Sequence, residues 1–386
     1  MRPLDGIKVI DFTQAHAGSL CTMYLADFGA EVIKIERPGS GDMCRNWPPF
    51  RDGASLYFSF LNRGKKSITV NASNPKGKEL LLELVGDADV VCENFKAGNM
   101  DRLGLGYEQL RLANDRIVYA SLSGYGANGP LKGLPAYDLM LQCQSGIAHL
   151  TGERSGIPIK AGQAIGDHLS GIYLANAICL ALIARAATGQ SQRVDISILD
   201  SIFSILGGAV LDYSGNGVHH KRNGNTSPWH APCDVFQTVT GFAALDVTNE
   251  LEWNGFCQTI GRQDLLADES LDNSEKRVRN YESGLKKIIG DYMATRSLDE
   301  VVEAFNRNSV PCSAVMDAGD LVDNPHHKVR NTFITVDGKA TGSVTMPGIS
   351  IKLGNAPGSV LSGAPALGEH NSEILQQYGY EEDEII

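Results

Sequence analysis

Short β-branched runs alternate with amphipathic helical segments through the first third of the chain, and this alternation constrains the fold most. Strands are predicted at 8–12, 31–35, 67–70, 89–92 and 117–122. Helices are predicted between them at 17–28, 76–85 and 107–113. Because strands that alternate with helices form βαβ units, the pattern predicts an α/β fold with a Rossmann-like parallel sheet.

The alternation of strands and helices ends after Leu122. The stretch 123–130 is rich in glycine and predicts a loop. Two apolar helices are predicted next, at 167–187 and 195–207. The most apolar run, 172–187, contains Asn176 and Arg185 and is shorter than the ~20 residues that a bilayer requires. We therefore expect this helix to be buried in a soluble protein.

The length of 386 residues exceeds the usual domain size of roughly 100 to 200 residues, which favours two domains. The polar run 216–232 indicates a boundary. Beyond it we predict a hairpin at 235–247 and helices at 283–295 and 298–308, which together make a smaller α+β unit over 226–318. Short β-rich pieces follow, with a helix opening near His370.

The net charge of −11, from 34 basic and 45 acidic residues, weighs against a general nucleic-acid binder. An anionic small ligand is still compatible, because a few arginines can make one cleft positive. The eight cysteines form no CxxC pair, and the N-terminus carries no apolar signal core. These features predict reduced thiols and a cytoplasmic protein.

The βαβ unit that opens the chain ends its second strand on Glu36, which suggests a dinucleotide site. The turn at 13–19 holds one glycine where that fingerprint requires three, so the dinucleotide interpretation fails. Arg37 follows directly, either as a phosphate ligand or as a solvated arginine in a turn. His16 precedes the first helix, where it could meet an anion or cap the helix.

Metal and hydrolase motifs are missing from the sequence. The histidines at 219–220 and 326–327 are adjacent pairs, which do not share a helix face, and there is no HExxH. We therefore predict no metal. The sequence also has no GxSxG elbow and no Walker loop, which excludes the common serine hydrolases and phosphate-transfer enzymes.

Asp167 begins the long apolar helix within the run GQAIGDHLSG at 162–171. One interpretation is a helix cap, because aspartate is a preferred N-cap residue. The other is a nucleophile: the helix is apolar nearly all round, so its mouth is expected to open into a cleft, and its N–H groups favour an ionised carboxylate. The local pattern leaves both interpretations open.

The chain resembles the class III CoA-transferases, which include formyl-CoA transferase and the carnitine and bile-acid CoA-transferases. The runs that carry the resemblance are PLDGIKVIDF at 3–12, FGAEVIKIERPG at 28–39, ENF at 93–95, LSGYG at 122–126, DHLSG at 167–171, TGQ at 188–190 and LGEH at 367–370. Each run alone is weak, whereas their order and spacing together are specific. The resemblance covers nearly the whole chain.

The resemblance implies that Asp167 is the catalytic aspartate. It would attack the donor acyl-CoA to give a mixed anhydride and CoA thiolate, and the thiolate would then form an aspartyl-CoA thioester. An acceptor carboxylate would repeat these steps in reverse. The anhydride is hydrolysable, so the chemistry requires exclusion of water and N–H groups that stabilise the oxyanion.

The resemblance also implies the residues that bind CoA, with CoA as a substrate and no metal. Arg37 and Arg102 would meet the nucleotide end. The path from there to Asp167 would be lined by His16, Ala17, Val70, Asn71, Ala72, Ser73, Asn94, Phe95 and Tyr137.

Three positions depart from formyl-CoA transferase. His16 stands in place of a glutamine, and Ser73 and Pro135 stand in place of lysines. The glycine run of the oxalate-specific members is absent, and Ser227 to Ala231 stand in that region. We therefore expect acids larger than formate: a short dicarboxylic acid such as succinate, a hydroxy acid, carnitine or an aryl acid, among which the sequence does not decide.

The architecture that the resemblance implies is an interlocked homodimer. Each chain would hold a large α/β domain, begun by 1–225 and completed by the return segment 319–386, with the small domain 226–318 between them. The partners implied are acyl-CoA and carboxylic acid substrates, with no nucleic acid and no membrane.

Two other functions stay open. A branch of the same superfamily isomerises α-methyl-branched acyl-CoA through a histidine and aspartate pair. A non-catalytic CoA-binding accessory protein is the third hypothesis, and an intact Asp167 weighs against it.

Overall fold

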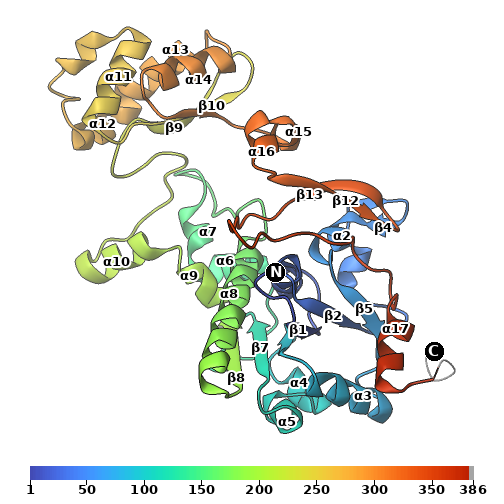
Figure 1. The fold of residues 1–386 in the computed structure, drawn as a ribbon. Coiled ribbons are helices and arrows are strands. Elements are labelled where there is room, and N and C mark those ends of the chain that lie inside the picture. Colours follow the sequence, from blue (N-terminus) through green and yellow to red (C-terminus); the bar gives the residue numbers. More distant parts are fainter. Residues whose placement is uncertain (382–386) are drawn as a thin grey trace. The chain divides into compact units, whose positions relative to one another are not determined.

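The computed structural model describes residues 1–381, which form two compact units (Figure 1). Unit 1 comprises 1–147, 160–215 and the chain from 325 onward, and unit 2 comprises 148–159 and 216–324. The predicted domains, a large domain begun by 1–225 and completed by 319–386 with a small domain at 226–318, stay a prediction.

A six-stranded parallel sheet forms the centre of unit 1, in the order β5-β2-β1-β6-β7-β8. Its strands are β1 (Lys8–Asp11), β2 (Glu31–Glu36), β5 (Lys66–Thr69), β6 (Val90–Glu93), β7 (Val118–Ser123) and β8 (Gln192–Ser197). The strand order reverses between β1 and β6, which is the topological switch point of a Rossmann fold. The predicted α/β class with a Rossmann-like sheet is confirmed.

Alternating side chains of these strands feed two hydrophobic cores, one on each face of the sheet. In β1, Val9 joins the core under α1 (Ala17–Asp27), α6 (Asp138–Ser145), α8 (Ile165–Thr188) and α9 (Ile198–Phe203), while Ile10 joins the opposite core. That second core packs under α3 (Pro75–Gly86), α4 (Asn99–Leu103) and α5 (Tyr107–Ala113). Burial on both faces explains why the strands are continuous apolar runs.

The structure corrects the helix predicted at 195–207. Residues 192–197 are β8, which pairs parallel with β7 through Ser121 and Asp195, and α9 begins only at Ile198. The run RVDIS alternates apolar and polar residues over too few positions to be told from a helix start by sequence alone. A further helix, α10 (Gly207–Asn216), follows α9.

The structure also corrects the expectation that the long apolar helix is buried all round. Within this chain α8 buries Leu174 and Ile178 against the sheet and α1, while Leu180 and Ile183 are 62% and 68% exposed. One chain supplies packing partners for one face of α8. By length and composition α8 also qualifies as a helix that could cross a membrane.

Several short elements complete the first part of unit 1. They are the 3-10 turn η1 (Met43–Asn46), the ribbon β3 (Phe50–Arg51) and β4 (Ala54–Ser55), and α2 (Leu56–Leu61). Another short helix, α7 (Ile147–Leu150), lies at the crossing into unit 2.

Unit 2 is an α+β unit built on the antiparallel sheet β11-β10-β9. Its strands are β9 (Cys233–Gln237), β10 (Phe242–Asp246) and β11 (Cys312–Ala314), so the predicted hairpin is confirmed. Its helices are α11 (Glu250–Ile260), η2 (Gln263–Leu266), α12 (Ser274–Asn280), η3 (Tyr281–Leu285), α13 (Lys286–Met293), α14 (Leu298–Arg307) and α15 (Ala318–Asp323).

The last segment returns to unit 1 through α16 (Pro325–Val329), the hairpin of β12 (Phe333–Gly338) and β13 (Gly342–Pro347), α17 (Asn371–Leu375) and η4 (Gln376–Tyr378). The segment at α17 lies along β5, where the backbone N–H of His370 donates to the Ser67 carbonyl at 2.9 Å. Arg63 makes a second tie, because it pairs with Asp27 at 2.7 Å and donates to the Pro347 carbonyl at 2.8 Å.

We predict that Asp27→Asn costs about 3–5 kcal/mol of unfolding free energy. Arg63 is fully buried, and the substitution removes the charge that compensates its guanidinium. Equilibrium urea unfolding measures the change. Asp291→Asn is the matched control, because its ion pair with Lys287 is exposed and is expected to change stability by less than about 0.5 kcal/mol. Equal effects of the two variants would contradict the prediction.

Candidate active site

Two neighbouring pockets lie beyond the carboxyl ends of the sheet strands, where ligands bind in open α/β folds. The arginine pocket has a volume of about 330 Å³ and is lined by segments that follow β1, β2, β5 and β6. The aspartate pocket has a volume of about 490 Å³ and is lined by segments that follow β1, β6, β7 and the start of α9. Gln14 and Phe95 line both pockets.

The turn between β1 and α1 forms the wall shared by the two pockets. Asn94 holds it from β6, accepting from the Gln14 N–H at 2.8 Å and donating to the Gln14 carbonyl at 2.7 Å. Asp42 accepts from the Ala15 N–H at 3.0 Å, and Ala15 has a left-handed φ of 61°. Because a non-glycine residue pays a steric cost in that conformation, the turn depends on these contacts to keep its shape.

Asp167 lies on the third residue of α8 and lines the aspartate pocket. The N-cap residue is Ala164, and the Asp167 carboxylate makes no capping bond. Asp138 of α6 instead caps the start of α8, because its carboxylate accepts from the Gly166 N–H at 2.8 Å. The capping interpretation of Asp167 is therefore wrong in this structure, and its carboxylate has no hydrogen-bond partner among residues 1–381.

The environment of Asp167 favours its neutral form. Burial and the nearby carboxylate of Asp138 together raise the pKa of Asp167 to about 7. Near neutral pH, Asp167 in the folded chain is therefore partly protonated and partly ionised. The ionised carboxylate is poorly solvated in these surroundings. Poor solvation makes an anion a stronger nucleophile.

His16 packs edge-on to His168 with ring centroids 4.3 Å apart, and its Nδ1 lies 2.5 Å from the Tyr57 hydroxyl. Burial and His168 lower the pKa of His16 to about 3, so the ring is neutral. Burial raises the pKa of Tyr57 to about 12, so its hydroxyl stays protonated and donates to Nδ1. The His16 proton is then on Nε2, which is buried and has no hydrogen-bond partner in the part of the chain that the structure describes.

The close approach of α8 to α1 brings Asp167 and His16 into one pocket. A Cβ placed on Gly171 would lie 2.6 Å from the Ala17 carbonyl oxygen and 3.1 Å from a Leu20 methyl carbon. Any larger residue at this position would push α8 away from α1, so glycine one turn after Asp167 sets the pocket width.

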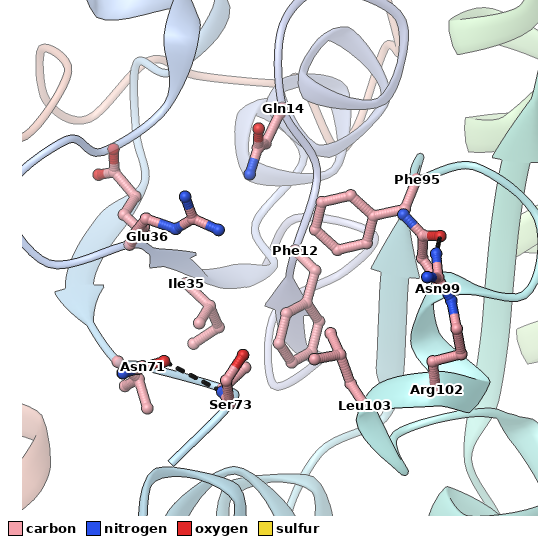
Figure 2. Close-up of a pocket in the computed structure, with 13 residues that line it drawn as sticks. Phe12, Gln14, Ile35, Glu36, Asn71, Ser73, Phe95, Asn99, Arg102 and Leu103 are labelled. Atoms are coloured by element: carbon pink, nitrogen blue, oxygen red, sulfur yellow. Dashed lines mark hydrogen bonds between the residues drawn. The ribbon is translucent and has the colours of Figure 1, made fainter. Parts of the chain in front are cut away.

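The structure places every predicted site residue on one of the two pockets. The arginine pocket holds Arg37, Val70, Asn71, Ala72, Ser73, Phe95 and Arg102 (Figure 2). The aspartate pocket holds His16, Ala17, Asn94, Phe95, Tyr137 and Asp167. The roles assigned to them stay predictions. His16 is not a helix cap through its side chain, because its ring bonds Tyr57.

The two arginines of the arginine pocket are exposed and pair with no carboxylate in the described chain. Arg102 donates to the Asn99 amide oxygen, and Figure 2 shows this bond at the edge of the pocket opposite Asn71. Ser73 is held by its backbone N–H, which donates to the Asn71 amide oxygen at 3.1 Å. Unpaired guanidinium groups beside a cleft are suited to phosphate groups.

Sequence reasoning missed several residues of the site. Tyr57 contacts His16 from a short helix that no pattern indicated. Asp138 reaches α8 across 28 residues of sequence, so no local spacing signals its contact with Gly166. Lys96, Met43 and Trp47 also line the aspartate pocket. The dipeptide Tyr137-Asp138 at a helix start was the one available cue for Asp138.

Unit 2 holds a group whose donor atoms lie within 4.8 Å of one another: His230, Cys233 and Asp246. His230 lies between the Ser227 hydroxyl at 3.0 Å and the Asp246 carboxylate at 2.7 Å, so hydrogen bonds within unit 2 already satisfy the ring. The prediction that the protein binds no metal stays a prediction.

Comparison with known proteins places the chain in a family. The model of CoA-transferase family III matches residues 4–371. A succinyl-CoA:mesaconate CoA-transferase of Haloarcula hispanica is 36% identical, over 98% of this chain and 97% of that protein. An acetyl-CoA:oxalate CoA-transferase of Acetobacter aceti is 36% identical, over 97% of this chain and 96% of that protein.

A solved structure supports the same placement. A CAIB/BAIF family protein from Brucella suis is similar with a TM-score of 0.89 and 33% identity, over 97% of this chain and 99% of that one. The chain therefore belongs to CoA-transferase family III and is an enzyme of the CoA-transferase class. The resemblance inferred from the sequence runs is confirmed.

We predict that Asp167→Asn stabilises the folded protein, and more at pH 8 than at pH 5. The pKa of Asp167 is raised from 3.8 to about 7 in the folded chain, so the folded state binds the extra proton and loses stability as pH rises between these values. Removing the charge should add about 2 kcal/mol or more at pH 8. Urea unfolding at the two pH values measures it, with Asp291→Asn as control. A stability gain that is equal at both pH values would contradict the assignment.

Proposed function

We propose that the protein transfers CoA from an acyl-CoA to a free carboxylic acid, with Asp167 as the covalent nucleophile. The observation that carries the proposal is the state of the Asp167 carboxylate. It lines a pocket of about 490 Å³, is partly buried and has no hydrogen-bond partner in the described chain, while Asp138 serves its helix end. A carboxylate with only a capping role would be bonded to that helix end.

The first half-reaction moves CoA onto the enzyme. A carboxylate oxygen of Asp167 attacks the thioester carbonyl, the new C–O bond forms as the C–S bond breaks, and CoA leaves as a thiolate. The thiolate then attacks the aspartyl carbonyl of the anhydride. A C–S bond forms there, the anhydride C–O bond breaks, and the donor acid leaves as its carboxylate.

The second half-reaction reverses these steps with the acceptor acid. Its carboxylate attacks the aspartyl-CoA thioester and displaces the thiolate, which then attacks the acceptor carbonyl. The new acyl-CoA leaves and the Asp167 carboxylate is restored. Charges and protons balance without an outside acid or base, so the neutral state of His16 is compatible with this chemistry.

The two pockets suit the two ends of an acyl-CoA. The nucleotide end, with its phosphates, fits the arginine pocket, where Arg37 and Arg102 have no competing carboxylate partner among residues 1–381. The chain of CoA would then pass Gln14 and Phe95, which line both pockets, to reach Asp167. We propose that Lys96 of the aspartate pocket replaces a lysine absent at Ser73 or Pro135.

For the acid, we propose one larger than formate, with short dicarboxylic or hydroxy acids first. The relatives are named for mesaconate and oxalate, which are dicarboxylates. The aspartate pocket adds aromatic and apolar walls from Trp47, Tyr125 and Leu134, together with Lys96 as a cation. Such walls favour an acid with a carbon body between its carboxylates over oxalate itself.

One observation weighs against the isomerase alternative. Exchange of an α-proton by a histidine and aspartate pair needs a histidine that can take up and return the proton. The pKa of His16, the histidine that lines the aspartate pocket, is lowered to about 3 by burial and His168. A group with so low a pKa is a weak base at neutral pH. Deuterium uptake from solvent into a branched acyl-CoA without any acceptor acid would support the isomerase instead.

We also propose that the protein is a cytoplasmic interlocked homodimer. The apolar side chains that α8 leaves uncovered include Ile172 at 48%, Leu180 at 62% and Ile183 at 68% exposure. An apolar face of this extent is expected to be covered in solution. A second copy of the chain, as the resemblance to the family implies, would cover it.

Loss of Asp167 is predicted to abolish transfer. Asp167→Ala should lower kcat by about 10³-fold or more, because the covalent route is lost. In the wild-type protein, acyl-CoA followed by hydroxylamine should leave a hydroxamate on Asp167, read by peptide mass spectrometry. The assay pairs acetyl-CoA or succinyl-CoA with a panel of free acids. Asp291→Asn should keep full activity, whereas full activity of Asp167→Ala would overturn the nucleophile.

Loss of either pocket arginine is predicted to weaken CoA binding. Arg37→Ala and Arg102→Ala should each raise KM for the acyl-CoA about tenfold and change kcat little, because each removes a charge-assisted phosphate contact far from the reacting carbon. Arg279→Ala, on the exposed face of α12, is the control. Unchanged KM in both pocket variants would move the nucleotide elsewhere.

The oligomer is predicted to have a mass of about 83 kDa, twice that of the 41.5 kDa chain, by light scattering after gel filtration. Leu180→Glu together with Ile183→Glu should shift the protein toward the monomer or toward aggregation, since charges would enter the covered face. A stable wild-type monomer would refute the dimer.

A further inference from the structure

We infer that Asp138 and Gln142 of α6 are positioning residues for Asp167: they occupy the polar groups around the start of α8, so that the Asp167 carboxylate is left unbonded and facing the pocket. This inference rests on the proposed function of Asp167. It assigns a role to two residues that neither touch the reacting atoms nor follow from a local sequence motif.

Four hydrogen bonds describe the arrangement. Asp138 Oδ1 accepts from the Gly166 N–H at 2.8 Å. Gln142 Oε1 accepts from the Ala161 N–H at 2.8 Å, and Gln142 Nε2 donates to Asp138 Oδ2 at 2.5 Å and to the Gln163 carbonyl at 3.4 Å. The side chain of Gln142 is fully buried. Two residues one turn apart on α6 thus bind the segment 161–166 at both of its ends.

The fit at Gly166 is steric as well as polar. A Cβ on this residue would lie 2.9 Å from Asp138 Oδ1 and 2.8 Å from a methyl carbon of Ile202. Glycine next to Asp167 therefore lets α6 and α9 close on the helix start, and the Asp138 carboxylate reaches the N–H that a capping side chain of α8 would otherwise take.

If Asp138 is removed, the N–H groups in the first turn of α8 lose their acceptor. The Asp167 carboxylate, which lies in that turn, can then rotate and accept from them. Bonded there, it would be a weaker nucleophile and would face away from the substrate. Asp138 has a second effect through its charge, since with burial it raises the pKa of Asp167 to about 7. Removal of Asp138 should therefore lower that pKa.

Among the titratable groups around Asp167, Asp138 is the one whose negative charge raises the pKa of Asp167. The aspartate pocket also holds His16 from the β1 turn, Lys96 from the segment after β6, and the phenols of Tyr125 and Tyr137. His168 lies next to Asp167 on α8, and Tyr57 interacts electrostatically with Asp167. Among the described residues that line this pocket, Asp138 is the one acidic group besides Asp167.

The test compares Asp138→Ala with the double variant Asp138→Asn/Gln142→Glu. The double variant can keep the bonds to Gly166 and Ala161 and the bond between the two side chains, because the new amide donates to the new carboxylate. It loses the bond to the Gln163 carbonyl, and the negative charge moves one turn along α6. We expect Asp138→Ala to lower kcat about 10- to 100-fold with KM for the acyl-CoA within about threefold. The double variant should recover most of that kcat.

A second readout needs no substrate. With ¹³C-carboxyl aspartate in the intact protein, the Asp167 resonance, assigned by its loss in Asp167→Asn, should titrate at lower pH in Asp138→Ala than in wild type. If Asp138→Ala does not fold, Asp138→Asn should show the same direction of shift. A wild-type titration midpoint in both Asp138 variants would overturn the inference, and so would wild-type kcat in Asp138→Ala.

These readouts separate the inference from the proposed function. If the wild-type protein shows no transfer with any acid of the panel, the proposed function fails, whereas the titration of Asp167 still decides whether Asp138 controls its carboxylate. If transfer occurs and the titration does not move, the positioning role fails alone.

Discussion

The site depends on four buried charges packed under the turn between β1 and α1. Lys34 donates to the Thr13 carbonyl at 2.7 Å and pairs with Asp42 at 2.9 Å, while Lys65 pairs with Asp11 at 3.1 Å. All four side chains are at most 2% exposed. Because two cations and two anions balance, the cluster tolerates burial, but loss of any one member would leave an uncompensated charge. This balance holds the shared wall of both pockets in place.

From that fixed turn the rest of the site follows by close packing. The turn delivers His16 beside α8, Gly171 lets α8 approach α1, and Asp138 takes over the helix end. At Asp167 this arrangement leaves a partly buried carboxylate without a hydrogen-bond partner among the described residues. The proposed nucleophile, which would form and release an anhydride, needs that freedom, and the surrounding scaffold supplies the stability that the site itself lacks.

Much of the large sheet could be predicted from the sequence, because strands buried on both faces are apolar runs that stand out between helices. β8 could not, since its run at 192–197 is short and leads directly into a helix. The partly exposed state of α8 could not either, because an apolar composition predicts burial without showing which side of the helix this chain covers.

The residues that line the two pockets were predicted mainly from the resemblance to the family. The hydrogen bonds that determine the state of Asp167 and His16 could not be predicted from the sequence. The contact of Asp138 with Gly166 and that of Tyr57 with His16 join segments 28 and 41 residues apart, and nothing in either local pattern encodes such a pairing. The local pattern left Asp167 between cap and nucleophile, and the family resemblance favoured the nucleophile. The geometry then excluded the cap, because Ala164 is the N-cap residue.

The most direct test of the account follows oxygen atoms. An acceptor acid labelled with ¹⁸O in its carboxylate, allowed a single turnover with the aspartyl-CoA enzyme, should leave one labelled oxygen on Asp167, seen as a mass increase of about 2 Da in its peptide. The proposed mechanism requires this label, because the bridging oxygen of the anhydride comes from the acceptor acid and stays on Asp167 when the CoA thiolate takes the acyl group. Transfer of CoA with no label on Asp167 would contradict it.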